Sequence, residues 1–126
     1  MRTSRFAPAL AALALAALPV LPAAAHHGWA WAEEAQTEMT GTIRTISFAP
    51  PHPSMTVDVD GTVWQVDLGN PSQTQRSGFA PGSAGEGHAV VILGNRSLNA
   101  DEKRIKAVRI TVGGQQFNMY PERIRE

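Results

Sequence analysis

Apolar and polar residues alternate along much of the chain, with the two-residue period of β-strands. Apolar residues occupy every second position from Met55 to Val59 and again from Trp64 to Leu68. Each of these strands is therefore expected to have one buried face and one face exposed to solvent. Asp60-Gly61 lies between the two runs and is a pair typical of a two-residue hairpin turn, since both turn positions need φ > 0.

Two further runs change the parity of their apolar positions. In the β-branched run from Thr40 to Phe48, the apolar residues shift phase after Ile43. A β-bulge near Arg44-Thr45 would put both sets on one face and bend the strand. The run from Ile105 to Val112 shifts in the same way and predicts a second bulge.

A short helix and two later strands complete the pattern. Asn70 is suited to cap a helix that has Pro71 at its first position, runs to about Arg76 and ends at Gly78. After the glycine-rich segment 81–87, the apolar run 88–93 predicts a buried strand, and another strand is expected at residues 117–120. This order, with one short helix between the third and fourth strands, predicts an all-β fold: a small OB-fold-like Greek-key barrel. A plain β-sandwich is the alternative and would not need that helix.

The first 25 residues have the three parts of a secretory signal peptide. Arg2 and Arg5 precede an apolar stretch, and Ala23 and Ala25 fit the small-residue positions before a cleavage site. An uncleaved anchor is the alternative, but the stretch is shorter than a spanning helix needs and prolines interrupt it. We therefore predict a periplasmic product that has no membrane attachment once the signal is cleaved. The predicted organisation is signal 1–25, linker 26–38, barrel 39–120 and charged tail 121–126.

Composition excludes several functions. The 126 residues include 11 basic and 11 acidic ones and no cysteine. Loss of the signal removes two arginines and leaves a slight acidic excess, so no basic surface for nucleic acid is expected. Disulfides, thiolate metal sites and a cysteine nucleophile are excluded. The acidic residues Asp58 and Asp60 belong to a wet strand face and its turn, and no hydrolase motif accompanies them.

Several short motifs follow one another along the mature chain. They are His26-His27-Gly28, Thr40-Gly41-Thr42, Pro51-His52, Trp64 to Gly69, Arg76-Ser77-Gly78 and Val90 to Gly94. In this order the chain resembles a family of small bacterial periplasmic proteins of unknown function. The resemblance implies the predicted fold and an exported location, and it implies no activity. Pro50 stands where the family's pattern has asparagine, which affects how the turn presents His52.

The strongest candidate for chemistry is the predicted mature amino terminus. Cleavage after Ala25 would leave a free amine on His26, and that amine and the imidazole of the same residue can chelate a metal ion. His52 supplies a third nitrogen in one arrangement, and the amide and imidazole of His27 complete the site in the other. Three nitrogens in a tetragonal plane suit Cu(II). We therefore predict a copper site formed by His26, His27 and His52.

Other interpretations of the same residues stay open. His26 and His27 can form a hydrophilic amino terminus that binds no metal, and His52 can be a solvent-exposed residue of its turn. Met39 and Met55 are expected in the core, Trp64 likewise, and His88 is expected to be structural. The first functional hypothesis is a non-enzymatic binding protein for copper. The second is a metal-free module that binds a small ligand or an envelope protein partner, and the third is a redox enzyme with a histidine-bound copper.

Overall fold

The computed structural model describes residues 3–4 and 28–125. The predicted signal peptide, apart from residues 3–4, lies outside the described residues, and so do His26 and His27. The elements are β1 (Thr37–Ser47), β2 (Ser54–Val59), β3 (Thr62–Asp67), α1 (Pro71–Arg76), β4 (Ala89–Arg96), β5 (Arg104–Val112), β6 (Gln115–Asn118) and the 3₁₀ helix η2 (Pro121–Arg123). The first strand begins two residues before the predicted domain boundary at Met39.

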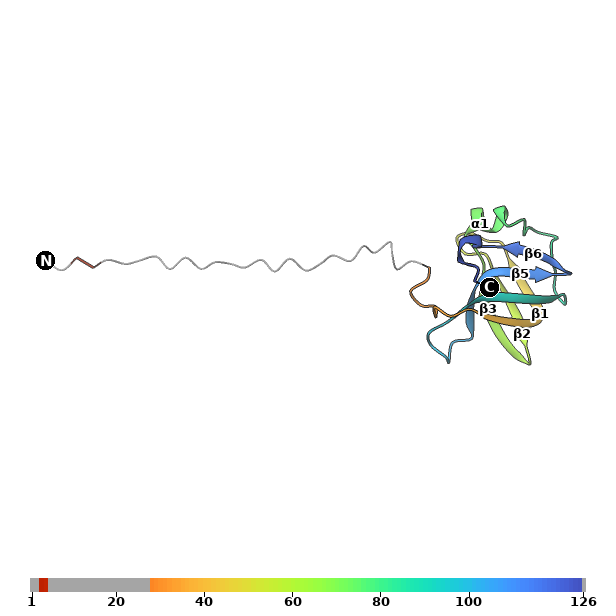
Figure 1. The fold of residues 1–126 in the computed structure, drawn as a ribbon, viewed down its shortest axis with the longest axis horizontal. Helices are drawn as coiled ribbons and strands as arrows, with labels where there is room; N and C mark the ends of the chain where they lie inside the picture. Colours follow the sequence, from red (N-terminus) through yellow and green to blue (C-terminus); the bar gives the residue numbers. More distant parts are fainter. Residues whose placement is uncertain (1–2, 5–27, 126) are drawn as a thin grey trace.

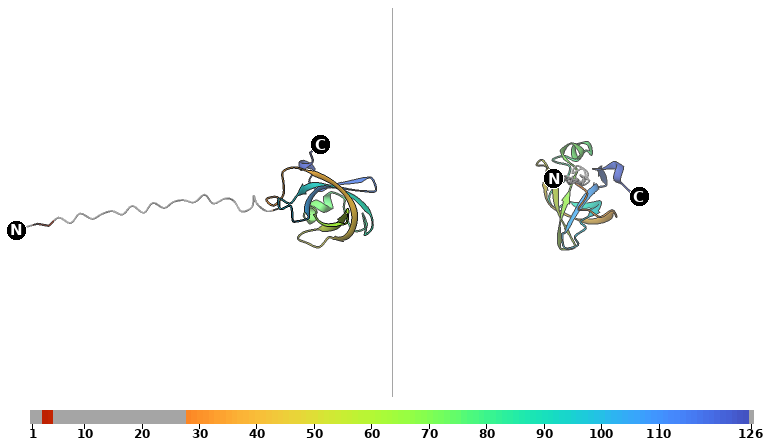
Figure 2. Two further views of the ribbon diagram at one scale, coloured as in Figure 1. Left: turned by 90° about the horizontal axis from the view of Figure 1, so that it is seen from below. Right: turned by 90° about the vertical axis from the view of Figure 1, so that its left-hand side faces the viewer.

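The strands β1 to β5 close into a barrel (Figure 1). β1 pairs with β2 and β4, β2 with β3, and β4 with β5, all antiparallel. A short parallel pairing of β3 with β5, from Gln65 opposite Arg104 to Asp67 opposite Lys106, closes the ring. Figure 2 shows the curved strands around this ring with α1 across one end. The arrangement is that of the OB-fold, and the predicted fold class is confirmed.

Both predicted bulges are present. In the β1–β2 pairing, Ile43 lies opposite Val57 and Thr45 opposite Thr56, so Arg44 is the extra residue. In the β4–β5 pairing, Leu93 lies opposite Arg109 and Gly94 opposite Ala107, so Val108 is the extra residue. The second bulge lets residues of both parities face inward: Ile105, Ala107, Val108 and Ile110 are all fully buried.

The core differs from expectation at three places. Met55 is buried as predicted, but Met39 and Trp64 are only partly buried and pack against the edge of the core. The strand β4 alternates, with Val90 and Ile92 buried and Val91 and Leu93 half-buried, instead of being buried throughout. The reason is that a strand of a closed barrel has one inner face only, so a continuous apolar run still leaves every second residue outside.

The turn and the helix follow their local sequence. Asp60 and Gly61 take φ of 51° and 85°, and the side chain of Asp58 accepts a hydrogen bond of 2.9 Å from the backbone N–H of Gly61. Asn70 caps α1: its Oδ1 accepts from the backbone N–H of Gln73 at 2.8 Å, and its own N–H donates to Gln73 Oε1 at 3.2 Å. Local residues thus fix these two connections without help from the rest of the barrel.

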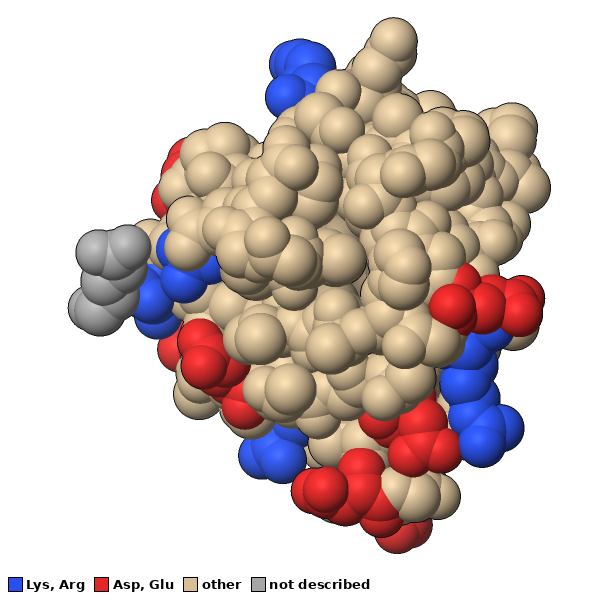
Figure 3. Space-filling view, turned by 90° about the vertical axis from the view of Figure 1, so that its right-hand side faces the viewer, with Lys and Arg blue, Asp and Glu red and all other residues tan. Residues whose placement is uncertain are grey.

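The outer surface carries mixed charge. On the face seen in Figure 3, basic and acidic side chains lie around the rim, acidic ones gather along its lower edge, and the centre of the face carries neither. Among residues 3–4 and 28–125, no helix is long and apolar enough to cross a membrane.

Candidate functional site

Two adjoining hollows open where the N-terminal segment meets the barrel. Their volumes are about 400 and 510 Å³, and Gly28, His52, Asp67 and Lys106 line both. We call the two together the N-terminal hollow. His52 is exposed in its proline-rich turn. His52 and Gly28 therefore border the same space, and Gly28 follows His26 by two residues.

The barrel's closure brings these residues together. Asp67 ends β3 and lies opposite Lys106 in the parallel pairing with β5. Asp67 also lies opposite Ser54, two residues after His52, in the pairing of β3 with β2. The connection that carries His52 is fixed to β3 by a 3.0 Å hydrogen bond from the backbone N–H of Leu68 to the carbonyl of Pro53. Each wall of the hollow is thus attached to hydrogen-bonded sheet.

Arg104 and Asp67 form the shortest ion pair at the hollow. Arg104 donates to Asp67 Oδ2 from Nε at 3.0 Å and from Nη2 at 2.6 Å. Burial alone would lower the pKa of Arg104, but the hydrogen bond and charge of Asp67, and then those of Glu102, outweigh it and raise the pKa. The guanidinium also stacks on the ring of Trp31, 3.9 Å from its centre. Arg104 therefore already has its partners.

Lys106 is placed differently. Its neighbour Ile105 is fully buried, so Lys106 points outward on the same side as Arg104. Its ammonium lies 5.1 Å from the ring centre of Trp29 and 5.6 Å from that of Tyr120. Burial lowers the pKa of Lys106, and the positive charges of Arg104 and Arg123 lower it further, while Asp67 opposes them. Among the described residues, no carboxylate forms an ion pair with Lys106.

The N-terminal segment is held against the barrel by aromatic and backbone contacts. Trp29 packs edge-on against Tyr120, with ring centres 4.9 Å apart. The Cζ atom of Arg123 lies over the Trp29 ring, 4.0 Å from the ring centre. The backbone N–H of Glu33 donates to the carbonyl of Arg96 at 2.7 Å, and Ala32 forms an isolated bridge to Ser97. Trp29 and Trp31 thus pack the linker on the domain, as the sequence led us to expect.

Of the three histidines predicted to bind metal, the structure describes His52 alone. Within residues 28–125, no three histidine, aspartate or glutamate side chains gather as a metal-binding group. The copper prediction therefore depends on the residues that precede Gly28. His88 stands before β4, and its Nδ1 accepts from the backbone N–H of Gly85 at 3.2 Å. This bond supports its structural role.

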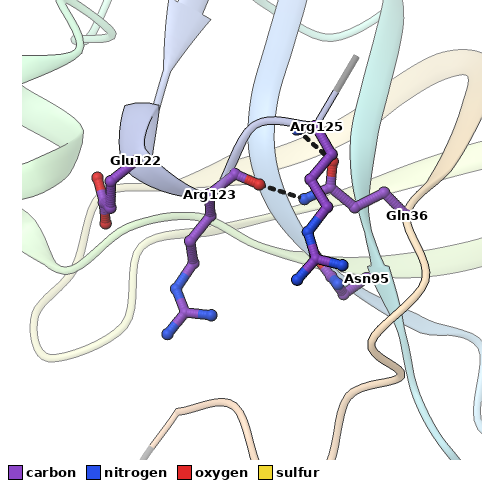
Figure 4. A pocket seen from close by; sticks show the side chains of 5 residues that line it. All are labelled: Gln36, Asn95, Glu122, Arg123 and Arg125. Atoms are coloured by element: carbon purple, nitrogen blue, oxygen red, sulfur yellow. Dashed lines mark hydrogen bonds between the residues drawn. The ribbon is translucent and has the colours of Figure 1, made fainter.

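A further hollow, of about 390 Å³, lies at the C-terminal segment (Figure 4). Gln36 fixes this segment, donating from Nε2 to the carbonyl of Arg123 at 2.6 Å and accepting from the N–H of Arg125 at 3.0 Å. The predicted charged tail is thus hydrogen-bonded to the side chain of Gln36 at Arg123 and Arg125. Asn95 Oδ1 has no hydrogen-bond partner among the described residues. Because this oxygen is buried from solvent, a ligand in the hollow could not reach it, and the candidate site is not placed here.

Sequence reasoning missed Lys106, Arg104 and the ion-pair role of Asp67. The available signal was the pattern Arg104-Ile105-Lys106, in which a buried strand residue separates two cations that must share the outer face. Their proximity to Asp67 and His52 depends on the β3–β5 pairing, which joins distant parts of the sequence. The local pattern does not contain that information.

Comparisons with known proteins show the family and the fold. A family model matches residues 13–106, and its description is a family of unknown function (DUF6152). No curated protein sequence matches the chain. The S. pombe Stn1–Ten1 complex contains a similar chain, with TM-score 0.50 and 19% identity, covering 61% of this chain and 57% of that one. At this identity the likeness concerns the fold alone.

Two structures of TiaS are also similar. The ZRD-deleted mutant in complex with agmatine has TM-score 0.48, and the complex with a tRNA, AMPCPP and agmatine has 0.47. Both are 11% identical and cover 61% of this chain, which spans 21% and 18% of theirs.

Proposed function

Because the chain belongs to the DUF6152 family, whose description assigns no activity, we propose a function from the residues around the N-terminal hollow. The chain is an exported binding protein, processed after Ala25 and released into the periplasm. It holds a Cu(II) ion at its mature amino terminus through His26, and either His52 or His27 completes the site. The observation that carries this proposal is that Gly28 and His52 line the same hollow.

Chain connectivity supports this arrangement. Only two peptide units separate His26 from Gly28, so their Cα atoms can be at most about 7 Å apart. An imidazole extends several ångströms beyond its Cα atom. The amine and imidazole of His26 are therefore within reach of the hollow that His52 borders. Nitrogen ligands in this number suit Cu(II) better than the harder divalent cations.

The test compares two forms of the protein that differ by one residue. One begins at His26, and the other carries one extra alanine before it. Cu(II) is titrated into each and followed by quenching of tryptophan fluorescence, because Trp29 and Trp31 lie near the proposed site. We expect the extension to weaken binding by at least about tenfold, since it moves the amine away from the His26 ring. Native mass spectrometry of the exported, untagged protein establishes the cleavage site.

Single substitutions separate the two ligand arrangements. His52→Ala weakens binding if His52 completes the site, and His27→Ala does so if His27 completes it. His88→Ala is the matched control, because that histidine lies at the opposite end of β4 from Arg96 and the linker. Affinity should fall as the pH is lowered, because the nitrogen ligands must lose their protons before they bind the metal. Equal affinity of the two N-terminal forms would contradict the copper site.

A second candidate is a metal-free OB-fold module for a small ligand or an envelope protein partner. The observation in its favour is the ammonium of Lys106, whose Nζ would lie 3.3 Å from a Cβ atom placed on Gly28. A positive charge at this place opposes a metal cation. If neither N-terminal form retains copper, this second function is the one to pursue.

A further inference from the structure

Among the described residues, the ammonium of Lys106 forms no ion pair, and it borders a hollow that has room for an anion. Lys106 is half-buried among Gly28, Trp29 and Tyr120 and has no ion-pair partner among the described residues. Asp67, its neighbour across the parallel pairing, accepts two hydrogen bonds from Arg104 on Oδ2. Removing an ammonium from water without pairing it is unfavourable. A ligand that brings one negative charge would remove that cost.

Neighbouring charges make the hollow attractive to an anion. Arg104 and Arg123 both act on Lys106 with positive charge, and Asp67 is the acidic residue that opposes them. Partial burial strengthens such interactions relative to open solvent, because the local dielectric constant is lower. The Lys, Arg, Asp and Glu side chains that line the described part of the hollow are two cations, Arg104 and Lys106, and one carboxylate, Asp67.

The remaining walls suit an apolar body next to the charge. The part of the hollow near Tyr120 has a volume of about 400 Å³ and is bordered by the rings of Trp29, Pro51 and Pro53. The amides of Asn70 and Gln73, from the start of α1, lie at the same opening. Small-molecule sites commonly combine a few polar groups with apolar and aromatic walls.

The charged groups favour a carboxylate over a phosphate. Phosphate sites commonly use the forked donors of arginine. The arginine that lines this hollow is Arg104, and its Nε and Nη2 are already bonded to Asp67. A single ammonium matches the single charge of a carboxylate.

We propose that the N-terminal hollow binds a small organic carboxylate, with the ammonium of Lys106 as its counter-charge and the rings of Trp29 and Tyr120 against its apolar part. This inference does not depend on the copper site. The carboxylate binds to metal-free protein as well.

The test uses the processed, full-length chain after treatment with a chelator. Phenylacetate and its neutral analogue phenylacetamide are titrated separately, with tryptophan fluorescence and NMR shifts of the Trp29 indole as readouts. We expect phenylacetate to bind at least about tenfold more tightly, because only the carboxylate can pair with the ammonium. Equal affinities, or binding of neither compound, overturn the proposal. This comparison needs no variant.

Two lysine variants locate the charge. Lys106→Met keeps the apolar stem and removes the ammonium, and it should abolish the preference for phenylacetate. Lys103→Met is the matched control: Lys103 directly precedes β5 but lies over Trp64, 5.6 Å from its ring centre, and does not line the hollow. An unchanged preference in Lys106→Met overturns the assignment of Lys106. Inorganic phosphate is the competitor, and tighter binding of phosphate than of phenylacetate overturns the choice of carboxylate.

The copper experiment and this one fail independently. Cu(II) binding is measured without the organic acids, and carboxylate binding is measured with the metal removed. Loss of the first with retention of the second contradicts the copper site alone. The reverse result contradicts the carboxylate site alone.

Discussion

At the residue scale, one arginine organises the surface beside the hollow. Arg104 bonds Asp67 through two nitrogens, approaches Glu102 Oε1 at 3.4 Å from Nη1 and stacks on Trp31. It thereby joins β3, β5 and the N-terminal segment. The alternation from Trp64 to Leu68 places Asp67 on the polar side of its strand but does not indicate its partner Arg104, which lies far along the chain. Two of the candidate copper ligands, His26 and His27, were by contrast predicted from adjacent residues and a cleavage pattern.

The Asp67–Arg104 pair should contribute measurably to stability. Asp67→Asn removes the charge from a carboxylate that is 16% exposed, and we expect the free energy of unfolding to fall by about 1–3 kcal/mol. Glu33→Gln is the control, because Glu33 and Arg96 are 3.8 Å apart and more exposed, and its effect should stay below about 0.5 kcal/mol. Urea unfolding of both variants measures the difference. Equal losses in the two variants would contradict the importance of the Asp67 pair.

Tyr120 makes stability depend on pH in the alkaline range. Burial raises the pKa of Tyr120; Arg123 opposes the shift, and Glu122 and Asp67 add to it. Between the ordinary value near ~10 and the raised pKa, the unfolded chain loses the phenol proton while the folded chain keeps it. Stability from this group is therefore complete below pH ~10 and is lost as the pH rises through the folded pKa.

The measurement compares Tyr120→Phe with the natural protein. Chemical unfolding at several pH values should show a smaller alkaline loss of stability in the variant. Lys106 acts in the opposite direction, because its pKa is lowered on folding, but it is present in both proteins and cancels in the comparison. An identical pH dependence would contradict the role of Tyr120. Tyr120 is the chain's one tyrosine, so its phenolate absorbance in the natural protein reports the raised pKa directly.

At the scale of the elements, features set by local sequence were predicted, whereas features set by the pairing of distant segments were not. The change of parity after Ile43 and the one between Ala107 and Val108 both predicted real bulges. Asn70 and Asp60-Gly61 predicted the helix start and the hairpin because these residues act on their own backbone. Pattern alone did not predict the exposed side of β4 or the bridge from Ala32 to Ser97, since each depends on which segment packs alongside.

A close approach of two strands is a second feature that local sequence does not reveal. A Cβ atom on Gly94 would clash with the carbonyl oxygen of Lys106 and lie 2.9 Å from Ile105 Cγ1. We expect Gly94→Ala to lower the free energy of unfolding by about 2 kcal/mol or more, because β4 must move from β5.

Gly85→Ala is the control for this prediction. A Cβ atom there meets nothing within 4 Å, and Gly85 is not among the residues with positive φ. Its effect should be small. Thermal unfolding followed by circular dichroism compares the two variants, and equal losses would show that the contact at Gly94 does not limit the packing of β4 on β5.

At the scale of the whole molecule, the order of strands and helix was enough to predict the barrel. Three strands, a short helix and two strands have few ways to bury their apolar faces, and closure between β3 and β5 is one of them. The hollow could not be predicted in the same way. Its walls come from the N-terminal turn, the β1–β2 connection, β3 and β5, so it exists only when the barrel is closed.

The brevity of the β3–β5 pairing has a consequence for how the protein folds. It spans three residue pairs and joins segments far apart in sequence, whereas the hairpin of β2 and β3 is local. Contacts of long sequence separation form after the entropy of a large loop has been lost, so closure is expected to follow the assembly of the antiparallel strands. An open, six-stranded form of the sheet would then expose β3 and part of β5 as unpaired edges, the kind of surface that recruits other chains. A ligand bound at the closed hollow would favour the ring over this open form and so protect the protein against self-association.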